Sequence, residues 1–190
     1  MIILVEKLAR ECKIKSQDLI TRPIGRSLFG KAMEKIKMAD KGETVILDFE
    51  NIKVIDSSFI DEFIVRLIEI SSTEDFYIKL KDISLMAEIN IDSVFHSYSN
   101  YKDKRIAAAR EELGRNNKYY IGPLTQEESD IIDYLKINHH SSLSELLRFS
   151  GIEEIKIMPI LQELYSLRVI KKINNEYYSV WDAIWKQKPK

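Results

Sequence analysis

The sequence predicts an α/β fold joined to a second, smaller domain. Through residues 1–103, short apolar segments typical of strands alternate with segments whose apolar residues recur at helical spacing. This alternation is typical of an α/β sandwich with a partly parallel sheet. Beyond that region come segments with apolar residues at helical spacing and then a hairpin signal. We therefore predict an α/β domain at 1–103, a linker helix at 104–117, and a helical domain with a C-terminal tail at 118–190.

The composition excludes several classes of protein. The 190-residue chain carries a net charge of -1, so no basic field over the whole chain points to nucleic acid or anionic membrane. No apolar run approaches the length of a transmembrane helix, and the first residues are too charged for a signal peptide. Cys12 is the only cysteine, which excludes an internal disulfide and a cysteine metal cluster. We expect a cytoplasmic protein without a membrane partner.

The first elements are a strand and a helix. Ile2 to Val5 predict a strand, whereas residues 6–12 fit either its continuation or a short helix. Pro23 lies close to a predicted helix start, and one apolar face then extends to about Met38. Residues 41–43, Lys-Gly-Glu, predict the turn into the next strand.

A strand–loop–helix unit at residues 44–70 forms the centre of the predicted domain. Val45 to Phe49 is a short apolar run rich in β-branched residues, typical of a buried strand. A helix then opens at Asp56-Ser57-Ser58, and Ser58 with Asp61 fits an acidic form of the capping box. The apolar residues at helical spacing are Phe59, Ile60, Phe63, Ile64, Leu67 and Ile68. Free N–H groups and the helix dipole at such a start favour an anion.

The rest of the first domain continues the alternation. Phe76 to Leu80 alternate apolar and polar residues and predict a strand, and a helix follows from Leu85 to about Tyr98. Residues 99–104 are polar and mark the domain edge. Arg105 to Leu113 are charged and rich in alanine, which predicts the linker helix.

The second domain contains predicted helices and strands. Residues 119–121 predict a strand. A capping box at Thr125 begins the first helix, and the second helix covers 142–149. A third helix is predicted from about residue 153 to 167, although Pro159 fits a first turn better and favours a start near Met158.

A hairpin closes the second domain. Val169 to Ile173 and Tyr177 to Val180 flank Asn174-Asn175-Glu176, a hairpin signal. The order of three helices, with a glycine turn between the second and third, and a closing hairpin resembles a winged helix-turn-helix. This resemblance covers residues 118–181.

The central unit also resembles a known family. Residues 47–59, LDFENIKVIDSSF, resemble the core of a STAS domain, the fold of bacterial anti-sigma-factor antagonists. Those proteins carry an Asp-Ser-Ser-Gly turn at a helix start, and a partner kinase phosphorylates one turn serine. Asp56, Ser57 and Ser58 match this turn, and Phe59 stands in place of the glycine.

A closer resemblance is to the STAS-like family of unknown function. Its pattern is an arginine, a helix, Asp-Phe, and then Ser or Ala followed by Phe-x-Asp-Glu. Arg22, Asp48-Phe49 and residues 59–62, Phe-Ile-Asp-Glu, match this pattern. The resemblance covers residues 1–115 and implies a domain that binds partner proteins and switches between them.

The serine turn is the first candidate site. The residues predicted for phosphorylation or partner contact are Asp56, Ser57, Ser58, Asp61 and Glu62. The alternative is that the serines only cap the helix. Likewise, Asp61 and Glu62 can complement the helix dipole, with Glu62 pairing to Arg66 at i,i+4.

The predicted third helix and hairpin are the second candidate site. Side chains suited to DNA contact are Lys156, Gln162, Ser166, Arg168, Lys171 and Lys172. Glu163 on the same helix would repel phosphate. The alternative is a winged helix that contacts protein.

The sequence contains no pattern of a catalytic or metal site. Its histidines, His96, His139 and His140, have no HxxxH or HxH spacing. No Ser-His-Asp order, glycine-rich phosphate loop or nucleotide fingerprint is present. We therefore expect no enzyme activity, cofactor or metal.

These observations support two hypotheses of function. The first is a regulatory protein whose STAS-like module binds a protein partner, such as a serine kinase of the anti-sigma ATPase type, under control of serine phosphorylation. The alternative is a transcriptional regulator that binds double-stranded DNA and uses the STAS-like module for sensing or dimerisation. The sequence is also compatible with a homodimer.

Overall fold

The computed structural model describes residues 1–181. The tail predicted at the C-terminus lies outside these residues from position 182 onward. Most buried apolar side chains form two cores. We call residues 1–121 the sheet unit and residues 122–181 the C-terminal unit.

A mixed sheet forms the centre of the sheet unit. Within residues 1–181 it has five strands in the order β1-β3-β5-β6-β7. They are β1 (Ile2–Leu4), β3 (Glu43–Asp48), β5 (Phe76–Lys81), β6 (Ala108–Arg110) and β7 (Tyr120–Ile121). Neighbours pair in parallel except β6 and β7, which are antiparallel. A separate parallel pair joins β2 (Asp18–Leu19) to β4 (Val54–Ile55).

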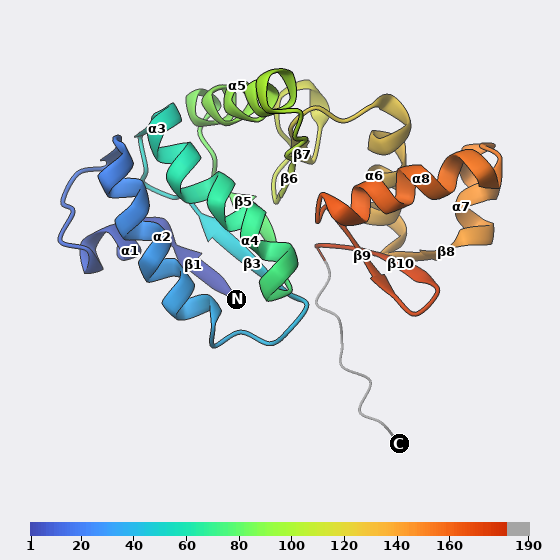
Figure 1. Cartoon of the computed structure of the whole chain (residues 1–190), viewed down its shortest axis with the longest axis horizontal. Coiled ribbons are helices and arrows are strands. Elements are labelled where there is room, and N and C mark those ends of the chain that lie inside the picture. The colour runs from blue at the N-terminus through green and yellow to red at the C-terminus, as the bar shows by residue number, and fades with distance from the viewer. Residues whose placement is uncertain (182–190) are drawn as a thin grey trace.

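Helices pack on the sheet to make the first core. They are α1 (Val5–Glu11), α2 (Arg22–Ile36), α3 (Ser57–Ile60), α4 (Arg66–Glu74) and α5 (Leu85–Lys102), with a π-helical segment, η1 (Asp61–Val65), between α3 and α4. Figure 1 shows α2 and α4 side by side in front of the sheet. The structure settles the open choice at residues 6–12, because most of that stretch is helix α1.

Strand alternation explains which side of the sheet faces the helices. Val45 and Leu47 of β3 join Ile78 and Leu80 of β5 in the first core. The residues between them in β5 point the other way, since successive side chains of a strand alternate. Tyr77, for example, packs with the C-terminal unit near Val180.

The predicted linker helix at 104–117 is wrong. Residues 108–110 form strand β6, and Arg115–Asn117 form a short 3-10 helix, η2. Ala108 lies in the first core, Ala107 in the second, and Ala109 against Tyr77. Helix propensity is a weak preference that burial overrides, and a strand presents small alanines to both sides. Ala107 and strand β6 of the sheet therefore contact both units.

The C-terminal unit combines helices with an antiparallel sheet. Its elements are α6 (Gln126–Asn138), β8 (His140–Ser142), α7 (Leu143–Ser150), α8 (Glu154–Ser166), β9 (Ile170–Ile173) and β10 (Glu176–Ser179). The sheet order is β8-β10-β9. The capping box at Thr125 is confirmed. Helix α8 begins at Glu154 and contains Pro159, so the later start near Met158 is wrong.

Polar contacts fix the C-terminal unit against the sheet unit. Arg168 donates hydrogen bonds to the carbonyl oxygen of Phe76 at 2.8 and 3.1 Å and to Asp75 Oδ1 at 2.9 Å. Its guanidinium also lies 3.7 Å from the ring centroid of Tyr77. Trp181 Nε1 donates to the carbonyl oxygen of Arg110 at 2.8 Å. The units therefore meet through specific contacts.

Candidate functional site

The candidate site is built around the turn that starts helix α3. The cap of this helix is Asp56, whose Oδ1 accepts a hydrogen bond from the backbone N–H of Phe59 at 2.7 Å. The prediction that Ser58 caps the helix with Asp61 is therefore wrong. Because the helix begins two residues earlier, the backbone N–H that a cap must satisfy belongs to Phe59 and not to Asp61.

Asp56 also ties this turn to the start of helix α2. Its carboxylate oxygens lie 3.3 and 3.4 Å from the backbone nitrogen of Thr21. Thr21 has φ 81°, a backbone conformation that a β-branched residue rarely adopts. Such strain persists only where neighbouring structure holds it. The contact with Asp56 helps to stabilise this conformation of Thr21. Arg22, which follows Thr21, thereby lies beside the π-helical segment η1.

The two turn serines have accessible hydroxyl groups. Ser57 is exposed and Ser58 is half-buried. Neither hydroxyl has a hydrogen-bond partner among residues 1–181. The structure therefore leaves both hydroxyls available at the positive end of the helix dipole.

A network of charged side chains lies one turn further along. Arg22 Nη1 donates to Asp61 Oδ2 at 2.7 Å and to Glu62 Oε1 at 2.9 Å. Glu62 also accepts from Arg26 at 3.0 Å and from Arg66 at 3.2 Å, which confirms the predicted pair with Arg66. Glu62 is buried, with only 8% of its surface exposed. Its contacts with these guanidinium groups therefore neutralise a charge that is held out of water.

The pKa values in this network follow from its hydrogen bonds. Arg26 and Arg22 lower the pKa of Glu62 to about 2. Burial raises the pKa of Asp61, but hydrogen bonds from Tyr98 and Arg22 outweigh it and leave that pKa below its usual range. Burial and the bond to Asp61 raise the pKa of Tyr98. Both carboxylates are thus ionised at neutral pH.

The geometry places the serine turn and the network on one face. Ser58 precedes Asp61 by three residues and Glu62 by four, spacings that bring side chains together on a helix. A group added to Ser58 would therefore lie close to Arg22 and its carboxylate partners. Arg22 bridges Asp61 and Glu62, and Arg26 holds Glu62 from a second side.

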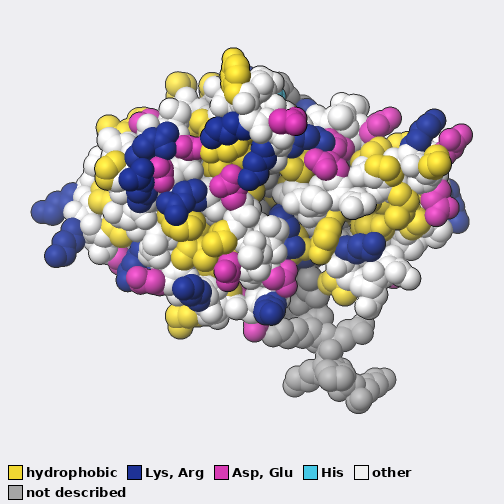
Figure 2. Space-filling model, viewed as in Figure 1, with side chains coloured by type: hydrophobic (Ala, Val, Ile, Leu, Met, Phe, Trp, Pro, Cys, Tyr) yellow, Lys and Arg dark blue, Asp and Glu magenta, His cyan; other side chains and the backbone are white. Residues whose placement is uncertain are grey.

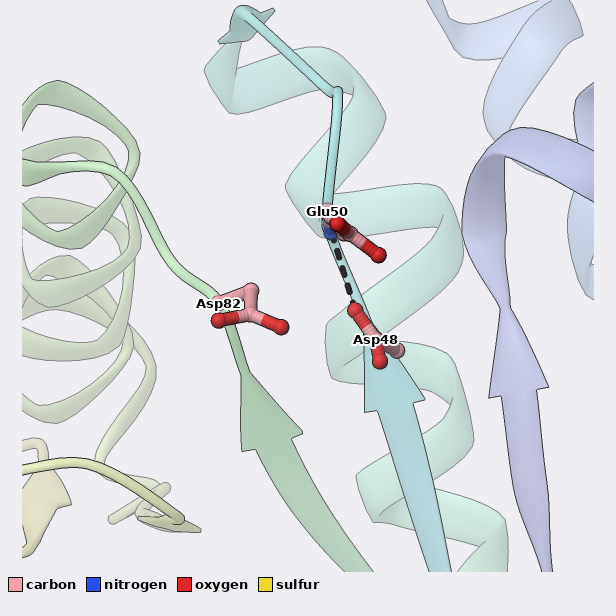
Figure 3. Close-up of side chains that lie close together, drawn as sticks. All are labelled: Asp48, Glu50 and Asp82. Carbon is pink, nitrogen blue, oxygen red and sulfur yellow. Dashed lines mark hydrogen bonds between the residues drawn. The ribbon is translucent and has the colours of Figure 1, made fainter.

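An acidic cluster lies at the carboxyl ends of strands β3 and β5. Figure 3 shows Asp48, Glu50 and Asp82, with a hydrogen bond of 3.0 Å from the backbone nitrogen of Glu50 to Asp48 Oδ1. Lys81 Nζ lies 2.7 Å from both Asp48 Oδ2 and Asp82 Oδ2. This ammonium group pairs with two of the three carboxylates, and an acidic cluster alone is no evidence of a bound cation.

The predicted DNA-contact residues divide into two groups. Lys156, Gln162, Ser166 and Lys172 are exposed. Arg168 and Lys171 are buried, with Lys171 Nζ donating to the carbonyl oxygen of Gly42 at 3.2 Å. The expectation that Arg168 and Lys171 reach DNA is therefore wrong, because the sheet unit covers both.

The exposed side of helix α8 carries large apolar side chains among its polar ones. Ile155 is 79% exposed, and Met158 and Tyr165 are also exposed. Figure 2 shows hydrophobic side chains gathered over this helix, whereas Lys, Arg, Asp and Glu are interspersed over the sheet unit. DNA-reading helices present basic and amide groups, and here Lys156 and Gln162 share the exposed side with these apolar residues.

Sequence reasoning missed Arg26 and Tyr98 as members of the network. They lie 36 and 37 residues away from the carboxylates that they contact. Arg22 was noted only as part of a family pattern. The available signal was that Arg22 and Arg26 are four residues apart on an expected helix, because residues at that spacing share one face.

Comparison with known proteins supports the STAS-like resemblance for part of the chain. Residues 28–90 match the model of a family described as a STAS-like domain of unknown function (DUF4325). The match includes strands β3 and β5 and the serine turn, and the mixed α/β architecture is consistent with it. It does not extend to the C-terminal unit. No curated protein and no solved structure matches the chain.

A membrane-spanning role has no support in the helices. Among residues 1–181, every helix is too short or too polar to cross a bilayer.

Proposed function

We propose that the protein is a non-enzymatic regulator whose STAS-like module binds a protein partner at the serine turn. The observation that carries this proposal is the pair of accessible hydroxyls on Ser57 and Ser58 beside a network of ion pairs. A partner surface docking there would meet fixed charges and a helix N-terminus. Such a surface changes sharply when a serine gains a phosphate.

Phosphorylation by a serine kinase partner would act through charge. A phosphate on Ser58 adds nearly two negative charges beside Asp61 and favours the helix N-terminus. It would compete with Asp61 for the guanidinium of Arg22, which is about half exposed and can turn. The result is a rearranged surface that binds the partner less tightly.

The first experiment compares capture of the partner by four forms of the protein. Wild type, Ser57→Asp, Ser58→Asp and Ser72→Asp are immobilised and exposed to lysate of the source cells. Ser72 is an exposed serine on α4 and serves as the matched control. We expect wild type and Ser72→Asp to retain the same partner, and at least one turn variant to lose about tenfold in affinity, a change of about 1.4 kcal/mol.

Equal recovery from all four forms would contradict the proposal. Thermal melts of each form establish that the variants remain folded, so a loss of binding can be assigned to the turn.

We further propose that the C-terminal unit is a winged helix-turn-helix used for protein contact. The order α6, α7, α8 followed by the β9–β10 hairpin, with β8 pairing to β10, supports this fold. The exposed Ile155, Met158 and Tyr165 of α8, and the burial of Arg168 and Lys171, favour a protein surface over a phosphate backbone.

DNA binding is the second candidate function, and the exposed Lys172 in β9 favours it. If the unit binds a duplex, Lys156→Glu with Lys172→Glu should weaken binding and flatten its salt dependence, because each lost phosphate contact lowers the slope by about one. Absence of duplex binding by the full chain at low salt would remove this candidate.

A further inference from the structure

A cavity lies where the C-terminal unit meets the open face of the sheet. Its volume is about 910 Å³. One side consists of residues from β3, β5 and the turn at 40–43, and the other of residues from β9 and the chain after β10. Helices α2 and α4 lie on the opposite face of the sheet (Figure 1), and on this face Tyr77 packs against Val180 of the C-terminal unit.

Aromatic and aliphatic side chains form much of the cavity wall. The wall residues of this kind are Ile46, Tyr77, Tyr165, Ile173, Val180 and Trp181. Tyr77 is held under the guanidinium of Arg168, and burial raises its pKa to about 12, so its hydroxyl stays neutral. These groups provide flat, apolar surface for a planar molecule.

The charges around the cavity favour an anion. Lys41 and Lys172 line it and are exposed, while Lys79 and Lys171 line it from buried positions. Lys79 is paired with Glu111.

Three carboxylates also line the cavity, those of Asp40, Glu43 and Asp75. Asp75 is paired with Arg168 at 2.9 Å. Asp40 and Glu43 lie in the turn that carries Lys41, and Glu43 pairs with the N-terminal ammonium group of Met1. Among the described residues, the lining therefore contains four lysines and three carboxylates, an excess of positive charge, and two of the lysines, Lys41 and Lys172, are exposed.

We propose that this cavity binds a small aromatic anion, a planar ring system carrying a carboxylate or sulfonate. Ligand sites typically measure about 300–1,000 Å³ and lie preferentially between structural units, with mostly apolar walls and a few charged groups. The rings lie against Tyr77, Tyr165 and Trp181, and the anionic group faces Lys41 and Lys172. This site is separate from the serine turn and does not depend on its function.

The position of the cavity gives such a ligand a second effect. It touches both the sheet unit and the C-terminal unit, so its binding energy adds to the contacts that hold them together. A ligand that binds only the folded, docked arrangement raises the melting temperature with its concentration.

The experiment uses 8-anilinonaphthalene-1-sulfonate, a fluorescent aromatic anion, with the full chain in its folded state. The neutral molecule N-phenyl-1-naphthylamine has the same rings without the sulfonate and reports the apolar contribution alone. The test variant is Lys41→Glu with Lys172→Glu. The control variant, Lys15→Glu with Lys53→Glu, makes the same charge change at exposed lysines outside the cavity.

We expect one saturable site for the anion on the wild type and on the control variant. The test variant should bind the anion about tenfold or more weakly, while its affinity for the neutral probe stays unchanged. Circular dichroism and thermal melts verify that both variants are folded. Absence of a saturable site, an equal loss in the control variant, or equal affinity for the neutral probe in place of the anion would overturn the proposal.

Discussion

At the scale of single residues, Asp56 joins two backbone segments by one carboxylate. It caps α3 through the N–H of Phe59 and lies within hydrogen-bond distance of the N–H of Thr21. We expect Asp56→Ala to lower the free energy of unfolding by about 1–2 kcal/mol, the usual cost of a lost cap. Chemical denaturation of the purified variant measures this change.

Ser58→Ala is the matched control for that prediction. Its hydroxyl has no hydrogen-bond partner among residues 1–181, so the change should stay within about 0.5 kcal/mol. A larger loss for Ser58→Ala than for Asp56→Ala would mean that the serine caps the helix after all.

Glu62 makes stability depend on acid. Its pKa is lowered in the folded protein to about 2 from an ordinary value of 4.5, so the unfolded chain binds a proton first as the pH falls. The stabilisation is complete above the unfolded value and is lost as the pH drops through the folded one. We therefore expect the wild type to unfold at a lower denaturant concentration as the pH is lowered from 4.5 to 2.

Glu62→Gln removes this titrating group. The variant should be less stable than the wild type at pH 7, and the difference between the two should shrink as the pH approaches 2. Parallel curves for the two proteins over this range would show that the arginine contacts do not lower the pKa of Glu62.

At the scale of elements, the packing of α2 on the π-helical segment η1 depends on a glycine. A Cβ atom on Gly25 would lie 2.8 Å from Glu62 Cβ and 3.1 Å from the carbonyl oxygen of Phe59. We expect Gly25→Ala to destabilise the protein by about 1–3 kcal/mol, because α2 must move away from η1. Thermal denaturation measures the loss.

Gly30 lies in the same helix and provides the control. A Cβ atom there meets nothing within 4 Å. Alanine is the better helix former by about 1 kcal/mol, so Gly30→Ala should stabilise the protein. If both substitutions change stability in the same direction, the close approach at Gly25 does not limit the packing.

The longer elements could be predicted from the sequence because their apolar periods extend over several turns. Helices α2, α5 and α8 and strands β3 and β5 fall close to the expected bounds. Three of the short strands, β2, β6 and β8, could not be found, since two or three residues carry too little pattern. Alanine at 107–109 favoured a helix locally, and only burial between two cores makes it a strand.

The candidate site was predictable where its contacts are local. The pair of Glu62 and Arg66 follows from helical spacing, and the structure confirms it. The contact of Arg22 with Glu62 joins positions 40 apart, and no local rule gives that distance in space. The position of the cap also could not be fixed, because Asp56 and Ser58 are both good capping residues.

At the scale of the whole molecule, Arg168 is one of two arginines that join the units by polar contacts; the other is Arg105, which contacts Glu128, Glu163 and the carbonyl oxygen of Pro123. Replacement of Arg168 leaves the carbonyl oxygen of Phe76 without that donor and Asp75 without its ion pair. We expect Arg168→Ala to lower the free energy of unfolding by about 1–3 kcal/mol. The substitution Arg148→Ala, at an exposed arginine of α7, should change it by less than about 0.5 kcal/mol.

Hydrogen exchange locates the effect of Arg168→Ala. Amides of β5 and β9 should exchange faster in this variant than in wild type, while those of α2 stay protected. Uniform loss of protection across both units would instead indicate that the arginine stabilises the fold as a whole and does not act at the junction.

The position of β6 and β7 in the sheet has a consequence for how the protein is made. A ribosome releases the chain from its N-terminus, and domains generally fold as they emerge. Strands β1, β3 and β5 can pair early, but the edge of β5 stays open until Ala108–Arg110 of β6 leave the exit tunnel. Until then, the backbone of β5 at Ile78 and Leu80 has no strand beside it on that edge. Another nascent chain could add a strand there. Rapid translation through residues 100–125 would shorten that exposure.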